Sequence, residues 1–579
     1  MKLNKFFISA GVLAAAMSLG SCVGDLDLTP TNPNEITDVT FKDDPRANME
    51  KLIADVYMQM ATFGPNGNNI LSSMDGGMST FQRAVFNLEE IPTDEANWLP
   101  SGDAIDPMFQ YGVIPANNSV VMGTYSRFMV IVTLANQFMQ TDFGFTSDAD
   151  KALHEEFCRQ ARIIRGLMYF YLIDNFGNVP YADENVTVGS VAPQLSRDFN
   201  EGRRMVFDRV VADLEDIVAW YKTNDPNNKP PYGYVGLDAA EALLVKYYLN
   251  AGVYTGTERW SDCYQHAEAV ISRLGHGGFK NSGLTKGYHQ NFGYNNKAFA
   301  IGGAGEVSEI IWTIPQESAS LTPDGHGLLS YANGGFMCNA WIGDAAPDEV
   351  NGTFLIDGKK YKYNVFQKQY NSGNGWKCMS ARRQFVEVFD WDAEYKYSPD
   401  IRTKMWKTAA DGFNINNGSF TQADWGNNGF LAVKYSNWYI NDNNQIDEAA
   451  SPAPVDPLGI DYAMIRLAEI YLSGAEAALN NGGDKTKALE WVNLIRERAG
   501  MEPYTSINLP ELRDERQREL YTECVRRSDL IRYGQWISGY TWNWKYNVAN
   551  GTDYPAYFNV YPLPTTVVER NGYTQNPGY

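Results

Sequence analysis

Histidine and cysteine are scarce in this chain of 579 residues, which contains five of the first and six of the second. No two histidines stand at the helical spacing of a metal-binding pair. A GxSxG nucleophile elbow and a Walker-type phosphate loop are also missing. These absences argue against the enzyme classes that leave a readable motif, and they predict a protein without a cofactor or a bound metal.

Glycosidases are the enzyme class that leaves no spacing signature. They use two carboxyl groups that meet only in the folded chain, and 69 Asp and Glu residues offer many such pairs. A solvated acidic surface explains the same number more simply. The prediction is therefore that the protein is not an enzyme, with a glycosidase as the alternative.

Positive charge is in short supply, with 48 Lys and Arg residues and a formal net charge of -21 at pH 7. Binding to nucleic acid depends on Lys and Arg that neutralise phosphates, and adsorption to anionic lipid headgroups depends on the same residues. The composition therefore argues against both. Beyond the N-terminus, the sequence has no apolar run long enough to span a bilayer.

The N-terminus has the pattern of an export signal. Two lysines precede an apolar segment over residues 6–19, and small residues follow it. The sequence Leu-Gly-Ser-Cys that ends at Cys22 looks like a bacterial lipobox, in which the cysteine becomes the acylated first residue. A signal peptide over residues 1–21 and a lipid anchor on Cys22 are predicted. The alternative is an ordinary secretory signal cut near residues 14–16, with Cys22 as an unpaired thiol.

Aromatic residues are plentiful at 13% of the chain, including 35 Tyr and 14 Trp. Sugar rings stack on flat apolar faces while their hydroxyl groups need polar partners. Loops that combine aromatic residues with Asn and Gly therefore favour a carbohydrate-binding surface. Such loops occupy about 66–112 and 275–460.

Helical periodicity dominates both ends of the chain. Apolar residues recur on one face from Met49 to Met60, and further amphipathic runs predict helices at about 118–141, 148–176, 200–222, 238–253, 258–274, 460–481, 485–499 and 509–534. Two stretches, from Ala240 and from Ala468, repeat a helix, a Gly/Asn break and a second helix. This pattern is typical of tetratricopeptide-like hairpins, and ordinary helical hairpins are the alternative.

Between about 275 and 460 the helical period is lost, and short alternating runs such as 309–315 predict small strands. A long irregular region inside a helical scaffold predicts a functional surface. We therefore expect one mostly α domain over 22–579. Its helical scaffold covers about 40–275 and 460–535, and its irregular ligand-binding region covers about 66–112 and 275–460.

Two polar segments are explained by a structural role, without binding or catalysis. Residues 441–448 offer oxygen ligands at alternating positions but lack the glycine of a calcium loop, so a polar turn is predicted. Charges alternate at three- and four-residue spacing in the segment 513–534, which predicts ion pairs between neighbouring turns of one helix. The alternating residues are Arg516, Glu519, Glu523, Arg526 and Arg527.

Four stretches carry a family resemblance: "RGLMYFYLIDNFGNVPY" from Arg165, "RLAEIYLSGAEA" from Arg466, the charged segment 513–534, and the C-terminal "YPLPTTVVERNGYTQNPGY". On these stretches the chain resembles the SusD/RagB family of Bacteroidetes outer-membrane glycan-binding lipoproteins, over essentially its whole length. The resemblance implies a mostly α fold with four tetratricopeptide-like units. It also implies a lipid-anchored protein of the cell surface that makes and breaks no bond.

The partners implied by the resemblance are an oligosaccharide and a SusC-like TonB-dependent transporter, on which the protein would sit as a lid. The helical repeats would face the transporter, and the irregular region would carry the ligand. The resemblance also implies a set of ligand-binding residues, which are Arg83, Trp98, Asp103, Phe336, Trp376 and Lys377.

Three positions depart from the starch-binding member of the family. Pro100 stands where that protein has a second tryptophan, Asp103 replaces an asparagine, and Phe336 replaces a tyrosine. A starch-type α-glucan is the predicted ligand. Because of these departures, another glycan such as a fructan, or a peptide as in the RagB branch, is the alternative.

The five remaining cysteines fall into two groups. Cys158, Cys263 and Cys524 lie in helical patterns and are predicted to be buried thiols. Cys338 and Cys378 lie in loop sequence of a chain with an export signal, where a disulfide is chemically permitted. Spacing alone does not establish the geometry of a bridge, so the sequence leaves both states open.

Overall fold

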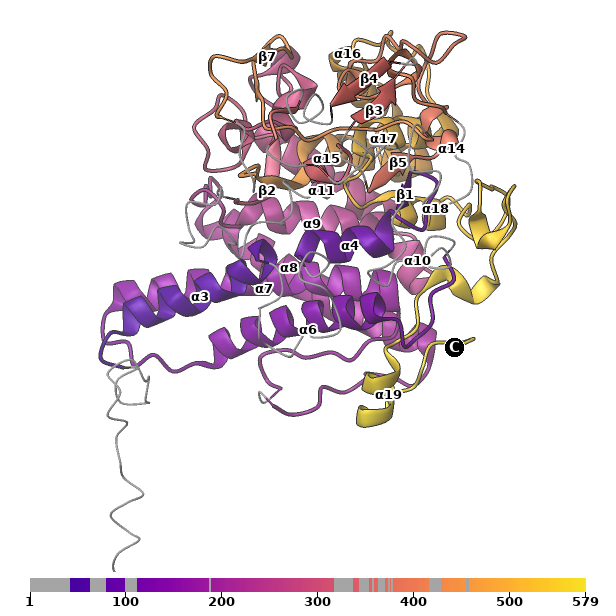
Figure 1. The fold of residues 1–579 in the computed structure, drawn as a ribbon. Coiled ribbons are helices and arrows are strands. Elements are labelled where there is room, and N and C mark those ends of the chain that lie inside the picture. Colours follow the sequence, from indigo (N-terminus) through magenta and orange to yellow (C-terminus); the bar gives the residue numbers. More distant parts are fainter. Residues whose placement is uncertain are drawn as a thin grey trace, which may run out of the picture.

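The computed structural model of the protein describes residues 42–62, 80–98, 112–186, 189–316, 337–342, 353–356, 359–362, 370–372, 375, 378–415, 428–453 and 458–579. Helices build its central and lower parts, whereas short strands and loops gather at the upper end (Figure 1). None of the helices in these residues is both long and apolar enough to cross a membrane.

The scaffold is a series of helices that pack on their neighbours along the chain. Helices α6 and α7 pack together, as do α8 and α9, and α15 and α16, while α11 lies against both α9 and α15 and so joins the two ends of the chain. Their bounds are α3 (Pro45–Ala61), α4 (Phe81–Glu89), α6 (Ser119–Gln140), α7 (Asp148–Phe176), α8 (Phe199–Asn224), α9 (Leu237–Leu249), α10 (Ala251–Thr255), α11 (Trp260–Leu274), α14 (Arg383–Val386), α15 (Leu467–Ala477), α16 (Lys485–Arg498), α17 (Leu509–Leu520), α18 (Arg526–Arg532) and α19 (Thr565–Asn571).

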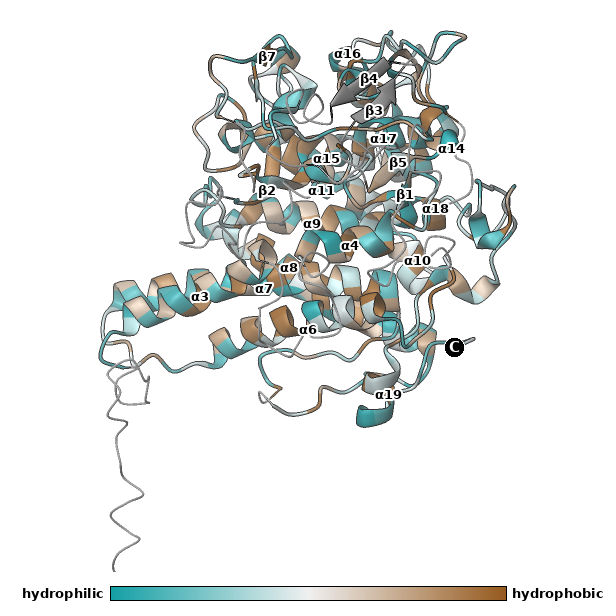
Figure 2. Cartoon of the chain, viewed as in Figure 1, coloured by the Kyte–Doolittle hydropathy of each residue, from teal (hydrophilic) through white to brown (hydrophobic). Residues whose placement is uncertain are grey.

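Local sequence explains where the long helices begin and end. The Ser147 hydroxyl accepts the Asp150 N–H and caps α7, and two aspartates in the first turn complement the helix dipole. Gly177, at φ 64°, ends the same helix. Figure 2 shows hydrophobic and hydrophilic residues alternating along α3, α6 and α7, as expected for helices with one buried face.

The strands are short, form antiparallel pairs and lie in the upper part of the molecule. Strand β2 (Ile310–Ile314) pairs with β8 (Tyr462–Arg466), which runs directly into α15. The other pairs within the described ranges are β1 (Ala96–Trp98) with β5 (Met379–Ala381), β3 (Thr353–Ile356) with β4 (Lys359–Lys362), and β6 (Tyr439–Ile440) with β7 (Ile446–Asp447). Single turns of 3₁₀ or π helix complete the loops: η3 (Phe279–Asn281), η4 (Tyr288–Phe292), η5 (Asn296–Phe299), η7 (Ile401–Thr403), η8 (Ala409–Asp411), η10 (Ala478–Gly482), η11 (Lys545–Asn547) and η12 (Ala556–Asn559).

Most of the predicted helices are confirmed, and the helix predicted at 148–176 has the same bounds as α7. Three predicted helices need correction. The run at 238–253 is divided between α9 and α10, and the run at 460–481 starts as strand β8 because its first residues pair with β2. The run at 509–534 breaks between α17 and α18, where Thr522 and Cys524 have φ of 63° and 61°.

The predicted polar turn from Asn441 is confirmed, and so are two of the three predicted buried thiols. The segment from Asn441 is a turn between β6 and β7, and the Asn441 side chain accepts the N–H groups of Asn443 and Gln445, which confirms the polar-turn interpretation. Cys263 and Cys524 are buried thiols as predicted, whereas Cys158 is half-buried.

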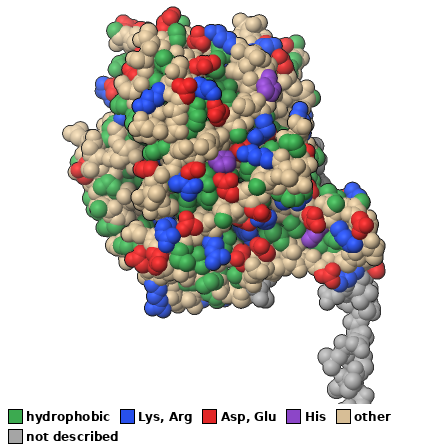
Figure 3. Space-filling view, turned by 180° about the vertical axis from the view of Figure 1, so that it is seen from behind, with side chains coloured by type: hydrophobic (Ala, Val, Ile, Leu, Met, Phe, Trp, Pro, Cys, Tyr) green, Lys and Arg blue, Asp and Glu red, His purple; other side chains and the backbone are tan. Residues whose placement is uncertain are grey.

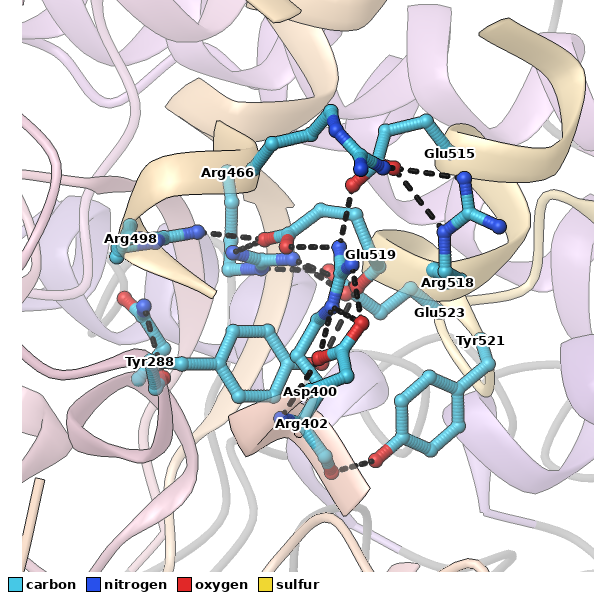
Figure 4. Close-up of polar contacts among 12 residues, drawn as sticks. Tyr288, Asp400, Arg402, Arg466, Arg498, Glu515, Arg518, Glu519, Tyr521 and Glu523 are labelled. Carbon is cyan, nitrogen blue, oxygen red and sulfur yellow. Dashed lines mark hydrogen bonds and ion pairs between the residues drawn. The ribbon is translucent and has the colours of Figure 1, made fainter. Parts of the chain in front are cut away.

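The alternating residues Arg516, Glu519, Glu523, Arg526 and Arg527 do not pair with one another along one helix, although Arg518 pairs with Glu515 in α17 and Arg532 with Asp529 in α18. Instead Glu519 meets three arginines from other elements, with Arg498 at 2.6 Å, Arg466 at 3.1 Å and Arg402 at 3.3 Å. Figure 4 shows these side chains converging between helices and loops. Because the helix breaks after Leu520, Glu523 and the later arginines lie outside α17 and turn to distant partners.

We call this buried network the charged core, which consists of Glu309, Asp400, Arg402, Arg466, Arg498, Glu515, Glu519 and Glu523. Burial by itself would raise the pKa of Glu309, but Arg498 and Arg466 lower that pKa to about 2. Arg466 contacts Glu309 at 2.8 Å and Glu523 at 2.6 Å. The charged core therefore ties β2, β8, α16 and α17 together through paired charges.

Candidate functional site

Of the predicted ligand set, the structure describes Arg83 on α4 and Trp98 on β1, which meet where β1 pairs with β5 (Figure 1). Trp98 on β1 pairs with Met379 on β5. The N–H groups of Cys378 and Met379 donate to the carbonyl of Ala340, at 2.8 and 3.0 Å. The segments that follow Phe336 and Trp376 in sequence are thus held side by side, next to Trp98.

Arg83 and Trp98 are in direct contact. The guanidinium carbon of Arg83 lies 3.8 Å from the centroid of the Trp98 ring, which is a cation–π geometry. The Arg83 Nε–H donates to Asn87 Oδ1 at 2.8 Å. Both side chains are buried, with 3% and 2% of their surface exposed. In this structure they form a packed layer beneath the surface and not an open stacking face.

The other members of the predicted set lie outside the described residues. These are Cys22, Asp103, Phe336, Trp376 and Lys377, and Pro100 lies outside them too. Their roles stay predictions.

Cys338 and Cys378 are both buried, and neither forms a disulfide in the structure. Burial raises the pKa of the Cys338 thiol well above its usual value. The structure brings the two segments together through the Cys378–Ala340 hydrogen bond. Of the two states that the sequence leaves open, the structure shows the one without a disulfide.

Arg382 is a positioning residue that sequence reasoning missed. Its backbone N–H donates to the Glu95 carbonyl at 2.9 Å, and its Nε–H donates to the Ala96 carbonyl at 3.0 Å. A third bond runs from its guanidinium to the Asn543 carbonyl at 2.7 Å. Arg382 therefore fixes the start of β1 to the C-terminal segment. This role could not be predicted from the sequence, where Arg382 is one arginine in a loop with no motif around it.

The link between α4 and β1 holds a second buried acidic cluster, which we call the carboxyl turn: Glu89, Glu90, Asp94 and Glu95. Asp94 is fully paired, because both its oxygens accept from Arg526 at 2.8 Å and Oδ2 also accepts from the Tyr540 hydroxyl at 2.7 Å. Burial alone would raise the pKa of Asp94, but Arg526 lowers it.

Glu90 and Glu95 accept hydrogen bonds from backbone N–H groups instead. Glu90 accepts the Cys524 N–H at 2.7 Å, and Glu95 accepts the Thr522 N–H at 3.3 Å. Burial raises the pKa of Glu95 to about 7 and raises that of Glu90 well above its usual value, where Glu95 adds to the rise. These contacts connect the strand that carries Trp98 to the break between α17 and α18, and they explain why the chain bends there.

A hollow of about 710 Å³ lies at the other end of the molecule, between α6, the loop before α8 and α19. Its wall combines apolar side chains such as Met122, Met129 and Val567 with polar ones such as Arg570. Neither Arg83 nor Trp98, the two described members of the predicted set, lines it. Volume alone does not make it the ligand site, since these two residues meet at β1.

The face seen in Figure 3 carries Lys and Arg side chains interspersed with Asp and Glu. No broad patch of one sign covers this face. The mixture offers no binding surface there for a highly charged polymer.

Comparison with known proteins agrees with this architecture. Residues 356–579 match the family model described as the SusD family. The chain is similar to "Starch-binding protein SusD" of Bacteroides thetaiotaomicron, with 26% identity over 100% of this chain and 99% of that protein. A SusD-like protein of Bacteroides ovatus is 23% identical over 74% of this chain and 69% of its own length.

Solved structures show the same fold. Surface glycan-binding protein A of Bacteroides fluxus covers 92% of this chain with 99% of its own, at 16% identity and a TM-score of 0.62. The protein of the same name from Bacteroides thetaiotaomicron, solved in complex with laminarihexaose, is 16% identical with a TM-score of 0.58 over 92% of this chain and 99% of its own. The expected mostly α fold is thereby confirmed: the chain has the fold of these SusD-like structures, and its residues 356–579 match the SusD family model.

Proposed function

We propose that this protein captures a soluble oligo- or polysaccharide at the cell surface, without catalysis, and passes it to a SusC-like TonB-dependent transporter. The observation that carries the proposal is the full-length similarity to a starch-binding protein, together with the contact between Arg83 and Trp98 at the expected place. Lipid anchoring through Cys22 after removal of residues 1–21 is part of the proposal, as is a single domain over 22–579.

A starch-type α-glucan is the proposed ligand, because the full-length relative is named for starch binding. Other similar structures are a laminarin-binding SusD-like protein and a complex with laminarihexaose, so a β-glucan is the second choice. Fructans and peptides remain the alternatives raised by Pro100, Asp103 and Phe336.

The proposed ligand surface lies over the packed layer of Arg83 and Trp98. Trp376 and Lys377 precede β5, Phe336 precedes the segment 337–342, and both segments are hydrogen-bonded to one another beside β1. An aromatic side chain would stack on a sugar ring, while a lysine and an aspartate would bond its hydroxyl groups. Arg83 and Trp98 support this surface from below.

The arrangement of the chain supports an orientation. The described residues begin at the start of α3, in the lower half of the molecule, and the strands lie at the upper end (Figure 1). An anchor on Cys22 would therefore bring the helical half toward the membrane and its transporter. The ligand surface would then lie on the side away from the anchor.

Calorimetric titration of the chain from Val23 onward tests the proposal, with maltoheptaose, laminarihexaose, an inulin-type fructan and a mixed peptide pool as ligands. Maltoheptaose should bind, and Trp376→Ala should weaken it about tenfold or more, which corresponds to about 1.4 kcal/mol. Trp220→Ala is the matched control, because Trp220 lies exposed on α8 under Arg159 and should leave binding unchanged.

Each result separates one alternative. Binding of laminarihexaose or fructan alone would keep glycan capture and change the sugar, and binding of peptides alone would contradict glycan capture. Prolonged incubation with maltoheptaose should release no shorter sugars. Accumulation of new reducing ends would show that the protein is a glycosidase.

A further inference from the structure

A smaller hollow, lined in part by aromatic side chains, lies just beyond β5, on the far side of the single helical turn α14. It has a volume of about 360 Å³ and is lined by Glu387, Phe389, Asp390, Trp391, Asp392, Ala393 and Tyr395. Ligand pockets in proteins measure roughly 300–1,000 Å³. None of the lining residues belongs to the predicted ligand set or to the surface proposed above.

Trp391 gives this hollow a rigid flat wall. Its indole N–H donates to the Val386 carbonyl at 2.8 Å. Its ring packs on Trp406 at 6.0 Å and edge-on against Phe430 at 5.5 Å, while the side chain stays half-buried and lines the hollow. Since the ring is already fixed, stacking a ligand on it would cost little side-chain ordering.

A tight turn presents Tyr395 beside this wall. The Asp392 carboxylate accepts the N–H groups of Glu394 and Lys396, and the Asp392 N–H donates to the Tyr397 carbonyl at 2.9 Å. Tyr395 has a φ of 55°, which is unusual for a bulky residue, and such strain concentrates at binding sites. The Tyr397 side chain is 67% exposed.

Polar groups around the hollow suit hydroxyl groups. In the described part of the chain, Asp390 is exposed and makes no hydrogen bond or ion pair, so its carboxylate is available as an acceptor. Glu387 is bound by Arg383 at 2.7 Å, and Glu394 is bound by Lys396 at 2.7 Å. Arg383 and Lys396 thus offset two of the four carboxylates of this loop, and the Asp392 carboxylate is taken up by the N–H groups of the turn.

We propose that this hollow is a second carbohydrate-binding site, in which Trp391 stacks on a hexose ring and Asp390 accepts hydrogen bonds from the hydroxyl groups of that ring. The choice of a neutral hexose polymer rests on the proposed function. Ten residues separate Ala381 on β5 from Trp391, so the two sites are at most about 35 Å apart along the chain. One long polysaccharide that occupies both sites gains affinity, because its second contact becomes intramolecular.

Hydrogen–deuterium exchange of the chain from Val23 onward tests the second site directly. Soluble starch and laminarin are the long ligands, and maltoheptaose and laminarihexaose are the short ones. Peptides that cover 387–397 should become protected when the long ligand of the matching sugar binds. In Tyr395→Ala, which changes a side chain that lines the hollow, affinity for that long ligand should fall about three- to tenfold while affinity for the short one changes less than about twofold.

Tyr294→Ala is the matched control, because Tyr294 is also a loop tyrosine, 37% exposed, and does not line the hollow. Asp390→Asn is a second variant that leaves the packing of Trp391 intact, and it should reproduce the loss. Protection elsewhere in the chain, with none at 387–397 and unchanged affinity in both variants, overturns the second site and leaves the proposed function standing. No protection anywhere by either polysaccharide overturns the proposed glucan ligand and the second site together.

Discussion

Two clusters of buried carboxyl groups in this protein respond to burial in opposite ways. In the charged core, arginines hold the pKa values of Glu309 and Glu523 below their usual range, despite full burial. In the carboxyl turn, Glu90 and Glu95 are equally buried, and their pKa values are raised. The difference lies in the partners, since arginine side chains face one cluster and mainly backbone N–H groups face the other.

The two clusters hold different parts of the molecule. The charged core joins β2 and the turn around Arg402, in the irregular region, to β8, α16 and α17 of the helical scaffold. The carboxyl turn joins α4 and β1 to the chain around Thr522 and Cys524, and thus positions Trp98. We infer that the scaffold loses stability in acid, whereas the support of the ligand surface loses stability as the pH rises through neutrality.

Removal of Arg466 should have the largest effect. Arg466→Ala leaves Glu309, Glu519 and Glu523 without a shared partner, and breaking a buried ion network of this kind costs about 3–5 kcal/mol. Urea unfolding followed by circular dichroism measures the loss. Arg513→Ala is the control, because its pair with Asp514 is partly exposed and should contribute less than about 1 kcal/mol.

A loss below about 1 kcal/mol in Arg466→Ala would mean that the charged core adds little to stability, as some buried ion pairs do. It would remove the contrast between the two clusters. If Arg466→Ala yields no folded protein while Arg513→Ala folds normally, the expected ranking still holds.

A smaller effect is expected at Asp94, which pairs with an arginine at hydrogen-bond distance, as the carboxyl groups of the charged core do. Asp94→Asn keeps the shape but removes the charge that faces Arg526, and hydrogen bonds to charged groups contribute about 1.5–3 kcal/mol. Urea unfolding at pH 7 should show a decrease of that size. Asp514→Asn, at a partly exposed pair, is the control and should be nearly neutral. An unchanged Asp94→Asn would show that Arg526 finds a substitute, for which Glu95 is the nearest candidate.

The scaffold was more predictable from sequence than the clusters that hold it. Amphipathic periodicity is local, and so are caps such as Ser147 and the stop at Gly177, which is why α7 could be predicted with both its ends. The break after Leu520 could not be predicted, because Glu90 and Glu95, far away in sequence, hold Thr522 and Cys524 in their positive φ conformations.

The site shows the same limit. Family resemblance named Arg83 and Trp98, but their mutual contact and their burial depend on how α4 meets β1. Arg382 could not be found at all, since its partners are backbone carbonyls whose positions only the fold defines. Alternating charge in 513–534 correctly predicted that these residues form ion pairs, but it predicted the wrong partners. The spacing of charges along one helix carries no information about charged residues on other elements.

The most specific expectation concerns pH and Glu95. Its folded pKa, at about 7, exceeds its usual value of 4.5, so between these values the folded state binds more protons than the unfolded state. Stability therefore falls as the pH rises through this window, and a raised carboxyl pKa has this sign whatever its cause. Glu95→Gln cannot ionise. Its stability should fall less from pH 5 to pH 8 than that of the natural chain, by at least about 1 kcal/mol, since one pKa unit corresponds to about 1.4 kcal/mol.

Urea unfolding at pH 5, 6, 7 and 8 measures this difference, and parallel profiles for the two proteins would contradict it. Below about pH 4.5 both proteins should lose stability together, because the lowered pKa values of Glu309 and Glu523 are common to both. Asp94 adds to the raised pKa of Glu95, whereas Arg526 opposes it. In an Asp94→Asn background, Glu95 should therefore ionise at lower pH beside Arg526, and Glu95→Gln should then destabilise the protein at pH 8. A change of sign between the two backgrounds would show that charge pairing, and not burial, decides which of these carboxyl groups is ionised.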